Sequence, residues 1–473
     1  MIRLGLRPLN PVGLLTLLLA AGLPARAAPI DVPEAIPVAQ AWLTAELSNP
    51  HLGLTPAELA ARQVALKDPA VTVLASDGRW LDTPPTGADA LGYVVSFPVG
   101  GYVLLTADDR LEPVLAFSAL DPFRGDDVPE NYLRKYVAHQ LPDRWKALRD
   151  QLAAGAAVPE HPRWVRLRAA LADGEPLDLN GAGDERGTYV LWGTPLWDQG
   201  SPYNALCAAQ NGGYNVPTGC TATAMAIKMR FHSWPPIGSG SHSYQDHWGS
   251  IQYYHSVNFG ASTYNWANMP GGNVTQPNAD VAQIMYHAGV AVDMNYELGA
   301  SGAWPHSAAM NNYFRYRDTI EIWSENPGDH QPAIVQSLYG GLPVVLSTND
   351  HTLVAAGYRQ SPSPYFYLNC GWSGASNGWY NLDGIPGGSP TIEESLPYCT
   401  PGHRIYVDGA WNGSELGSLL QPYNTVGEGN AAVPTGGQLW IKGGTYTGAG
   451  NIPTTFNRAM TVVGYEGVVT IGP

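Results

Sequence analysis

The chain has 473 residues, more than one hydrophobic core normally serves, so its length predicts two or three domains. Hydrophobic residues make up 44% of it and charged residues only 14%, which excludes an intrinsically disordered chain. The formal net charge of −15, without a compensating run of lysine or arginine, disfavours nucleic acid and anionic membrane surfaces as partners.

Residues 1–27 have the three parts of a secretory signal peptide. Arg3 and Arg7 precede an apolar run, and residues 25–27 supply an A-x-A cleavage site. The apolar run is too short to span a bilayer, and no later stretch reaches about 18 uninterrupted apolar residues. The pattern predicts an exported protein without a membrane span, either secreted and extracellular or held at the cell surface or in the periplasm.

Residues 28–187 are predicted to form an α+β domain that ends in a linker at about residues 173–187. In that linker aromatic residues are absent and Gly, Asp and Glu accumulate, which is typical of a site where a protease cuts. The other predicted elements are, in chain order, short helices at 38–43 and 58–60, a strand meander at 92–118 and a helix within 121–151.

Residues 188–408 form an aromatic-rich second region that is also predicted to be α+β. In its first part apolar residues recur at helical spacing, and in its last part β-rich runs are separated by turn signals. The predicted helices are 220–231 and 280–288, and the predicted antiparallel strands are 344–347, 351–358 and 365–372.

Residues 409–473 are rich in Gly, Asn and Thr, with short predicted strands at 439–441 and 461–463. The strand spacing resembles the opening of a pectin-lyase-like parallel β-helix, which needs about three coils to bury its own core. Two interpretations stay open for this segment: a carbohydrate-binding or surface-binding face, or a partly folded remnant or truncated piece of a longer protein.

The four cysteines lie far apart at positions 207, 220, 370 and 399, without the spacing of a zinc site or a disulfide framework. Cys220 is predicted to open a helix, because small and apolar residues follow it at helical intervals. The positive end of a helix dipole favours a thiolate, so Cys220 is a candidate nucleophile. The alternative is a small buried core residue.

Residues 217–227 read Pro-Thr-Gly-Cys-Thr-Ala-Thr-Ala-Met-Ala-Ile, and residues 197–204 read Trp-Asp-Gln-Gly-Ser-Pro-Tyr-Asn. Both stretches resemble the streptopain family of secreted, papain-fold cysteine peptidases. The resemblance implies that Cys220, preceded by Gly219, is the nucleophile. It also implies that the Gln199 amide donates to the oxyanion, beside the Cys220 backbone N–H.

His351 opens a predicted strand of small and apolar residues, resembling the strand that carries the general base in this family. A base there would take the proton of the Cys220 thiol and return it to the departing amine. The other histidines lack this context, and four of them are predicted to be solvated or hydrogen-bonded loop residues: His232, His242, His247 and His255.

Asn369 lies one predicted strand after His351, and the resemblance assigns it the orientation of the imidazole, with Trp372 in a supporting role. Cys370 stands where the family usually has a tryptophan that screens this contact, so either the contact is weaker or another aromatic such as Trp379 rebuilds it. Cys370 could instead form a disulfide with Cys399 or Cys207 and brace the loop.

The strand meander at 92–118 resembles the family's propeptide, which covers and distorts the active site until it is removed. The resemblance extends over about residues 35–400 and implies a papain-like peptidase domain behind an α+β propeptide domain. It implies protein or peptide substrates, a preference for an apolar residue beside the cleaved one, and no metal or organic cofactor.

Two other functions stay open. A catalytically weak papain-fold module could act with the C-terminal segment as a surface-binding or adhesion protein, as the Cys370 departure suggests. A thiol transferase or amidase could use the same Cys220 and His351 pair to pass an acyl group to an acceptor other than water.

Overall fold

The computed structural model describes most of the chain beyond residue 28, with gaps. The leader predicted at residues 1–27 and most of the linker predicted at 173–187 lie outside the described residues. The described ranges are 29–49, 52–76, 78–82, 90–123, 132–177, 179, 188–207, 209–210, 214–248, 251–297, 299, 301–324, 326–348, 351–360, 364–382, 392–452 and 455–472.

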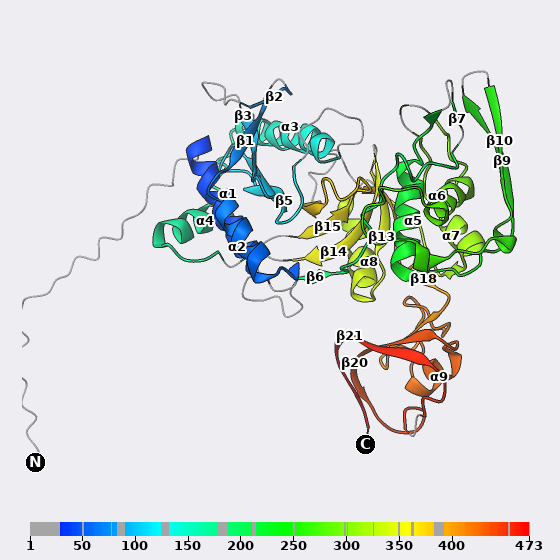
Figure 1. Cartoon of the computed structure of the whole chain (residues 1–473). Helices are drawn as coiled ribbons and strands as arrows, with labels where there is room; N and C mark the ends of the chain where they lie inside the picture. Colours follow the sequence, from blue (N-terminus) through cyan, green and yellow to red (C-terminus); the bar gives the residue numbers. More distant parts are fainter. Residues whose placement is uncertain are drawn as a thin grey trace, which may run out of the picture.

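The N-terminal region is an antiparallel sheet with helices on both faces (Figure 1). The expected meander is confirmed as three successive strands, and side chains alternate between its faces. Tyr93 and Val95 face a core shared with α1 and α4, whereas Val94 faces α3. The elements are α1 (Val32–Leu47), α2 (Pro56–Ala65), β1 (Ala70–Ala75), β2 (Trp80–Leu81), β3 (Ala90–Ser96), β4 (Tyr102–Thr106), β5 (Val114–Ser118), α3 (Tyr132–Ala153) and α4 (Pro162–Asp173).

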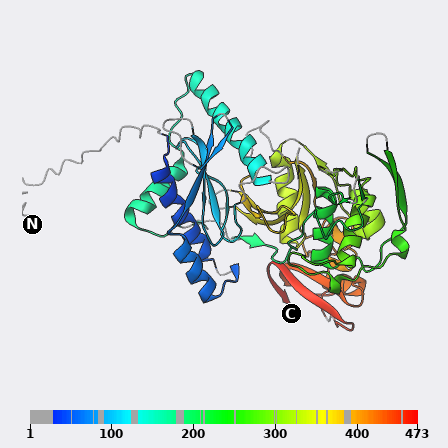
Figure 2. The same ribbon diagram turned by 45° about the horizontal axis from the view of Figure 1, so that its top comes forward.

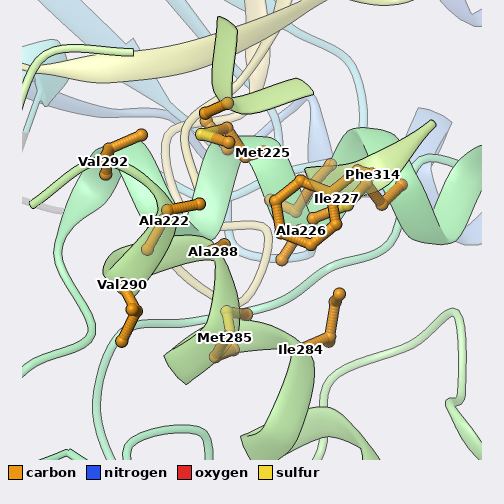
Figure 3. Close-up of a cluster of buried hydrophobic side chains, with 14 of the residues drawn as sticks. Ala222, Met225, Ala226, Ile227, Ile284, Met285, Ala288, Val290, Val292 and Phe314 are labelled. Atoms are coloured by element: carbon orange, nitrogen blue, oxygen red, sulfur yellow. The ribbon is translucent and has the colours of Figure 1, made fainter. Parts of the chain in front are cut away.

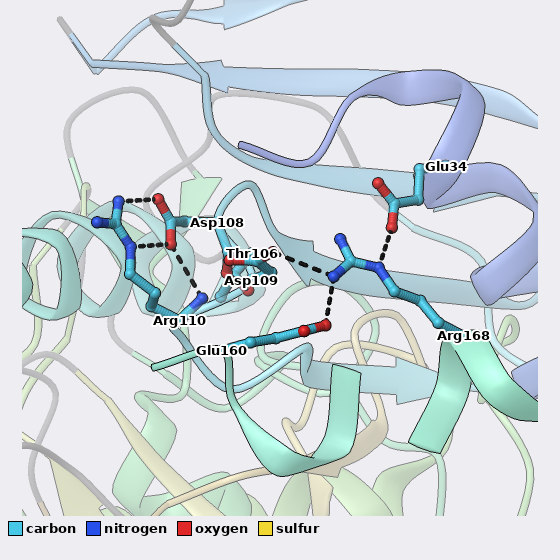
Figure 4. A network of polar contacts seen from close by, with 7 residues as sticks. All are labelled: Glu34, Thr106, Asp108, Asp109, Arg110, Glu160 and Arg168. Atoms are coloured by element: carbon cyan, nitrogen blue, oxygen red, sulfur yellow. Dashed lines mark hydrogen bonds and ion pairs between the residues drawn. The ribbon is translucent and has the colours of Figure 1, made fainter. Parts of the chain in front are cut away.

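The sequence pattern does not predict the helix α4, because its residues resemble the approach to the linker that follows them. It buries Trp164 and Leu167 against the sheet. Arg168 of α4 connects two other elements, since its guanidinium lies 2.6 Å from the Glu34 carboxylate of α1 and 3.1 Å from that of Asp109 after β4 (Figure 4). The helix therefore belongs to the N-terminal domain.

The second region packs α5 (Cys220–His232) between α6 (Ala279–Ala291) and the strands β13 (Val344–Thr348) and β14 (Thr352–Arg359), which confirms these predicted helices and strands. Figure 3 shows the side chains of α5 meeting those of α6. The remaining strands of its sheet are β6 (Tyr189–Val190), β12 (Ile322–Trp323), β15 (Tyr365–Asn369), β16 (Gly378–Tyr380) and β17 (Ile392–Leu396).

Outside this sheet, the second region has further short strands and helices, most of them on the side of α5 and α6, whereas residues 327–339 pack on the opposite face of the sheet. They are β7 (Ala209–Gln210), β8 (Tyr214–Asn215), β9 (His242–Trp248), β10 (Ile251–Val257), the 3-10 turns Phe259–Ala261 and Trp266–Asn268, α7 (Ser307–Phe314), β11 (Tyr316–Arg317), α8 (Pro327–Tyr339) and β18 (Thr400–Pro401).

The two regions share one sheet, because β5 of the first pairs antiparallel with β16 of the second (Figure 2). Beside this junction Nη2 of the buried Arg359 guanidinium donates to both carboxylate oxygens of Glu46 of α1, at 2.8 and 3.0 Å. Removing one partner of a buried ion pair leaves the other charge buried without compensation, so this pair stabilises the packing of the N-terminal region against the second region.

The C-terminal segment is a three-stranded parallel sheet, β19 (Arg404–Val407), β20 (Gly437–Tyr446) and β21 (Met460–Ile471), with α9 (Val426–Ala432) in one connection. Its first strand lies before residue 409, where the sequence placed the boundary. Trp440 packs against Gly341 of the second region. Among the described residues, no helix has both the length and the apolar composition needed to cross a membrane.

Candidate active site

Cys220 is the first residue of α5, and the glycine before it shapes the entry to the helix. Gly219 has a φ of 87°, which L side chains rarely adopt. A Cβ on Gly219 would also lie 2.6 Å from Met294 Sδ and 3.0 Å from the Ser301 carbonyl oxygen, so the close packing favours glycine as the positive φ does. The turn leaves the Cys220 side chain at the positive end of the helix dipole, where a thiolate is favoured.

His351 immediately precedes β14, which packs against α5, and its imidazole forms a hydrogen bond with Cys220. Burial raises the pKa of the Cys220 thiol, but this hydrogen bond and the imidazolium charge outweigh burial. Donors from Thr352 add to the effect, and the pKa falls from 9.0 to about 7. Cys220 can therefore ionise to a thiolate near neutral pH beside the imidazole.

The far side of the His351 ring is held by the backbone. Nε2 lies 2.9 Å from the Cys370 carbonyl oxygen. A carbonyl only accepts hydrogen bonds, so Nε2 carries a proton and Nδ1 is left to exchange one with Cys220. Trp372 stacks on the imidazole, with ring centroids 4.3 Å apart and planes at 26°. The tautomer and the orientation that a general base requires are thus both set.

The Asn369 side chain, expected to orient the imidazole, is engaged elsewhere. Its amide donates to the Pro195 carbonyl at 2.9 Å and to Thr194 Oγ1 at 3.3 Å, and its oxygen accepts from the Gly371 N–H at 3.1 Å. Asn369 ends β15, and the chain then turns through Gly371, whose φ is 71°. The acceptor for the ring is therefore the carbonyl one residue later, while Asn369 braces the turn.

Cys370 is buried and unpaired by disulfide, as are Cys207 and Cys399; all four cysteines are free, which contradicts the alternative of a disulfide through Cys370. The Cys370 thiol lies 3.4 Å from the Ser376 carbonyl, and burial raises its pKa.

Trp379 does not take over the screening of the imidazole. It stacks on Phe117 of β5, with ring centroids 6.3 Å apart, and the Arg359 guanidinium lies over its ring. Trp372 covers the imidazole instead.

Gln199 lies next to the nucleophile loop. The backbone carbonyl of Gln199 accepts the backbone N–H of Thr218, two residues before Cys220, at 2.9 Å. Asp198 fixes the turn by accepting the Gln199 N–H at 2.7 Å, and it also accepts the Ser373 hydroxyl at 2.7 Å. The structure therefore brings together Gln199, the start of α5 and the turn that carries Trp372.

A hydroxyl chain beside Cys220 was not predicted. Thr352 Oγ1 lies 3.0 Å from Thr221 Oγ1 and 2.7 Å from Ser347 Oγ. The signal in the sequence was weak: single polar residues at the ends of two apolar strands. These hydroxyls lie beside the start of α5.

Three of the four histidines expected in loops lie instead in regular elements, where they have ordinary partners: His232 ends α5, His242 begins β9 and His255 lies within β10. His232 meets the Tyr316 hydroxyl at 3.0 Å, His255 that of Tyr286 at 3.0 Å, and His242 the Asp293 carboxylate at 2.6 Å. The side chain of His247 lies outside the described residues. Within the described ranges, no three His, Cys, Asp or Glu side chains gather as a metal site would require.

The sequence of this chain is similar to one protein family and to several known proteins. Residues 197–380 match the Peptidase C10 family. The chain is 30% identical over 308 residues to the thiol protease/hemagglutinin PrtT of Porphyromonas gingivalis, covering 61% of this chain but only 33% of that protein. It is 25% identical over 336 residues to streptopain of Streptococcus pyogenes, covering 64% of this chain and 78% of streptopain.

Two solved structures are also similar. A prointerpain A fragment from Prevotella intermedia has 26% identity and a TM-score of 0.49, covering 68% of this chain and 98% of the fragment. Active interpain A has 31% identity and a TM-score of 0.40, covering 46% of this chain and 96% of interpain A. The family match and the sequence relatives indicate a cysteine-type peptidase domain at residues 197–380.

Proposed function

We propose that this chain, whose residues 197–380 match the Peptidase C10 family, is a secreted cysteine endopeptidase made as a zymogen. The observation that supports it most directly is the hydrogen-bonded pair of Cys220, at the start of α5, and His351. A helix terminus and an imidazole together activate a thiol, whereas a structural cysteine needs neither.

In the proposed acylation step, the Cys220 thiolate attacks the carbonyl carbon of the scissile peptide bond. The resulting oxyanion accepts hydrogen bonds from the Gln199 side-chain amide and the Cys220 backbone N–H. The C–N bond then breaks as His351 Nδ1 protonates the departing amine. The Cys370 carbonyl keeps the proton on Nε2 throughout, so the ring exchanges protons only on the Cys220 side.

In deacylation, a water molecule attacks the thioester and His351 takes its proton. The acid product leaves and the thiolate and imidazolium pair is restored. Every group in this sequence of steps is a protein side chain or backbone group, so we expect no cofactor to be required. Transfer to an acceptor other than water would be seen in the products.

Residues 28–187 are proposed to form the pro-region. Besides the β5 and β16 pairing, this region contacts β15, which leads into the turn that supports the imidazole, since the Tyr367 hydroxyl donates to the Asp121 carboxylate at 3.5 Å. A Cβ on Gly374 of that turn would lie 3.7 Å from the same carboxylate. Contact with the turn gives the pro-region a route to control His351 and Trp372.

The C-terminal segment is proposed to be the opening of a parallel β-helix. Its strands pair in parallel and in register, with Ile405 opposite Leu439 and Leu439 opposite Val462. The adhesion alternative rested on the replacement at Cys370. Because the backbone there holds His351 and Trp372 covers it, that replacement no longer argues against catalysis.

The test is casein hydrolysis by residues 28–473 after maturation, with and without an irreversible thiol-directed peptidyl inhibitor. Residues 404–407 pair with β20, so the C-terminal segment is kept. Activity that the inhibitor and Cys220→Ala both abolish supports the proposal. A folded, processed protein that leaves casein intact and Cys220 unlabelled would refute it.

A further inference from the structure

Glu394 of β17 is a buried carboxylate that the proposed mechanism does not use. Its exposure is 0%, and neither carboxylate oxygen has a hydrogen-bond partner among the described residues. An unpaired carboxylate is costly to bury, so such groups are rare outside sites that serve a ligand. Glu394 therefore calls for a functional explanation.

The strand register places Glu394 on the same face of the sheet as the catalytic pair. Glu394 is directly opposite Ser347 of β13, and Ser347 is opposite Thr352 of β14. Directly opposed residues of antiparallel strands project to the same face. Thr352 contacts Cys220, so a continuous row of side chains leads from the nucleophile to Glu394.

A second set of contacts connects Glu394 with the nucleophile, through the indoles of Trp323 and Trp304. Trp323 of β12 is opposite Glu394 on the same face, and its ring lies 5.3 Å from that of Trp304. Both indoles are partly exposed, at 52% and 41%. The residue before Trp304 is Ala303, whose carbonyl accepts the hydroxyl of Thr221, next to Cys220.

The charges of this site are acidic. Burial, followed by the negative charge of Glu321, raises the pKa of Glu394 to about 8. Glu321 itself is partly exposed and holds the Ser307 N–H at 2.6 Å. A cation that entered between the two indoles and this pair would ionise Glu394 and supply its missing partner. The faces of Trp304 and Trp323 also attract cations.

We propose that Glu394 is a specificity residue that recognises a lysine or arginine side chain of the substrate, at the second position before the scissile bond. This inference rests on the proposed peptidase function. Glu394 lies two strand spacings from Thr352, about 10 Å. In an extended substrate the second residue lies about 7 Å from the bond, so a long basic side chain covers the remaining distance.

The row lies on the acyl side of the cleaved bond. His351 protonates the departing amine, so the leaving half of the substrate lies toward the imidazole and Trp372. The Glu394 row extends from Thr352 in the opposite direction, across β13 and β17. A basic preference at this position would differ from the apolar preference that the family resemblance implies.

The test uses the mature protein and peptidyl aminocoumarin substrates that differ only at this second position, which is arginine, its uncharged isostere citrulline, or leucine. Loss of a hydrogen bond to a charged group lowers binding by about 10- to 100-fold, so kcat/KM for arginine should exceed that for citrulline by this factor. Glu394→Gln should bring the ratio close to one. Equal rates for arginine and citrulline in the unaltered protein would overturn the inference.

The matched control is Glu393→Gln, which removes a partly exposed carboxylate one residue away on the opposite face of β17 and should change the ratio by less than about threefold. If Glu394→Gln fails to fold, the comparison of arginine with citrulline in the unaltered protein decides alone. Cleavage of the leucine peptide and labelling of Cys220 show that the peptidase function stands even when charge discrimination is absent. Failure of both would overturn the proposed function and this inference together.

Discussion

Two cysteines lie on opposite sides of the same histidine, and they differ in every property that matters for chemistry. Cys220 opens α5 and shares a hydrogen bond with the His351 imidazole, and its pKa is lowered to about 7. Cys370 lies in the turn after β15, where burial raises the pKa of its thiol and only its backbone carbonyl touches the ring. Position in the fold, rather than residue type, separates the nucleophile from the support.

The comparison also explains how the site tolerates an unusual residue. The turn needs a backbone carbonyl at position 370 and a ring at Trp372, and both are independent of the side chain of Cys370. The backbone of Cys370 is in turn fixed by Asn377, whose Oδ1 accepts its N–H at 2.8 Å. A small buried side chain is sufficient there.

The largest expected effect comes from removing the nucleophile. Cys220→Ala should lower casein hydrolysis by about 10⁴-fold or more, since loss of a catalytic nucleophile removes the covalent route. The matched control is Cys207→Ala, because that thiol is buried and its pKa is raised to about 12. Comparable losses in the two variants would contradict the distinction between catalytic and structural cysteines.

The next largest effect is expected from removing the proposed oxyanion donor, Gln199, while the nucleophile is kept. Gln199→Ala should lower kcat by about 10²- to 10³-fold, which is typical for one oxyanion donor. Alkylation of Cys220 by a small electrophile develops no oxyanion and should proceed at nearly the normal rate. If alkylation fell as far as hydrolysis, Gln199 would be supporting the structure rather than the transition state.

A pH profile of alkylation sharpens the contrast between the thiols. With a pKa of about 7, Cys220 is half ionised at pH 7, whereas an ordinary thiol of pKa 9.0 is about 1% ionised, a roughly 50-fold difference in thiolate. The rate of iodoacetamide labelling at Cys220, followed by peptide mapping, should rise with pH to a plateau through a midpoint near 7. A midpoint near 9 would contradict the pairing with His351.

The smallest expected effect comes from changing Trp372, which stacks on the His351 imidazole. Trp372→Leu should lower kcat/KM by about tenfold or less, because aromatic stacking contributes about 0.5–1.5 kcal/mol beyond burial. Trp372→Phe should restore most of the loss. A thermal unfolding curve separates this effect from destabilisation, and equal kinetics in both variants would show that stacking on His351 is unimportant.

The sequence was sufficient to predict the local features of the site. The spacing of apolar residues after Cys220 predicted α5. The residue before the helix is Gly219, whose positive φ favours glycine. The strand that follows His351 was likewise evident from its apolar run. These features depend on neighbours in the chain, which helical and strand periodicity reports directly.

Apart from the Cys220 and His351 pair, which the family resemblance supplied, contacts between distant segments could not be predicted. Asn369 was assigned the imidazole, but the path of the turn at Gly371 gives that role to the Cys370 carbonyl, and sequence does not reveal backbone acceptors. The orphaned carboxylate of Glu394 depends on the register of three strands. The helix α4 was missed because its two buried residues form too short an apolar pattern.

The most direct test of the account is to treat the matured protein with a thiol-directed peptidyl electrophile and locate the adduct by mass spectrometry while casein hydrolysis is followed. The account predicts one adduct, on Cys220, formed in step with the loss of hydrolysis, and no adduct on Cys207, Cys370 or Cys399. Loss of hydrolysis with Cys220 unmodified, or full labelling of Cys220 with hydrolysis unchanged, would contradict it.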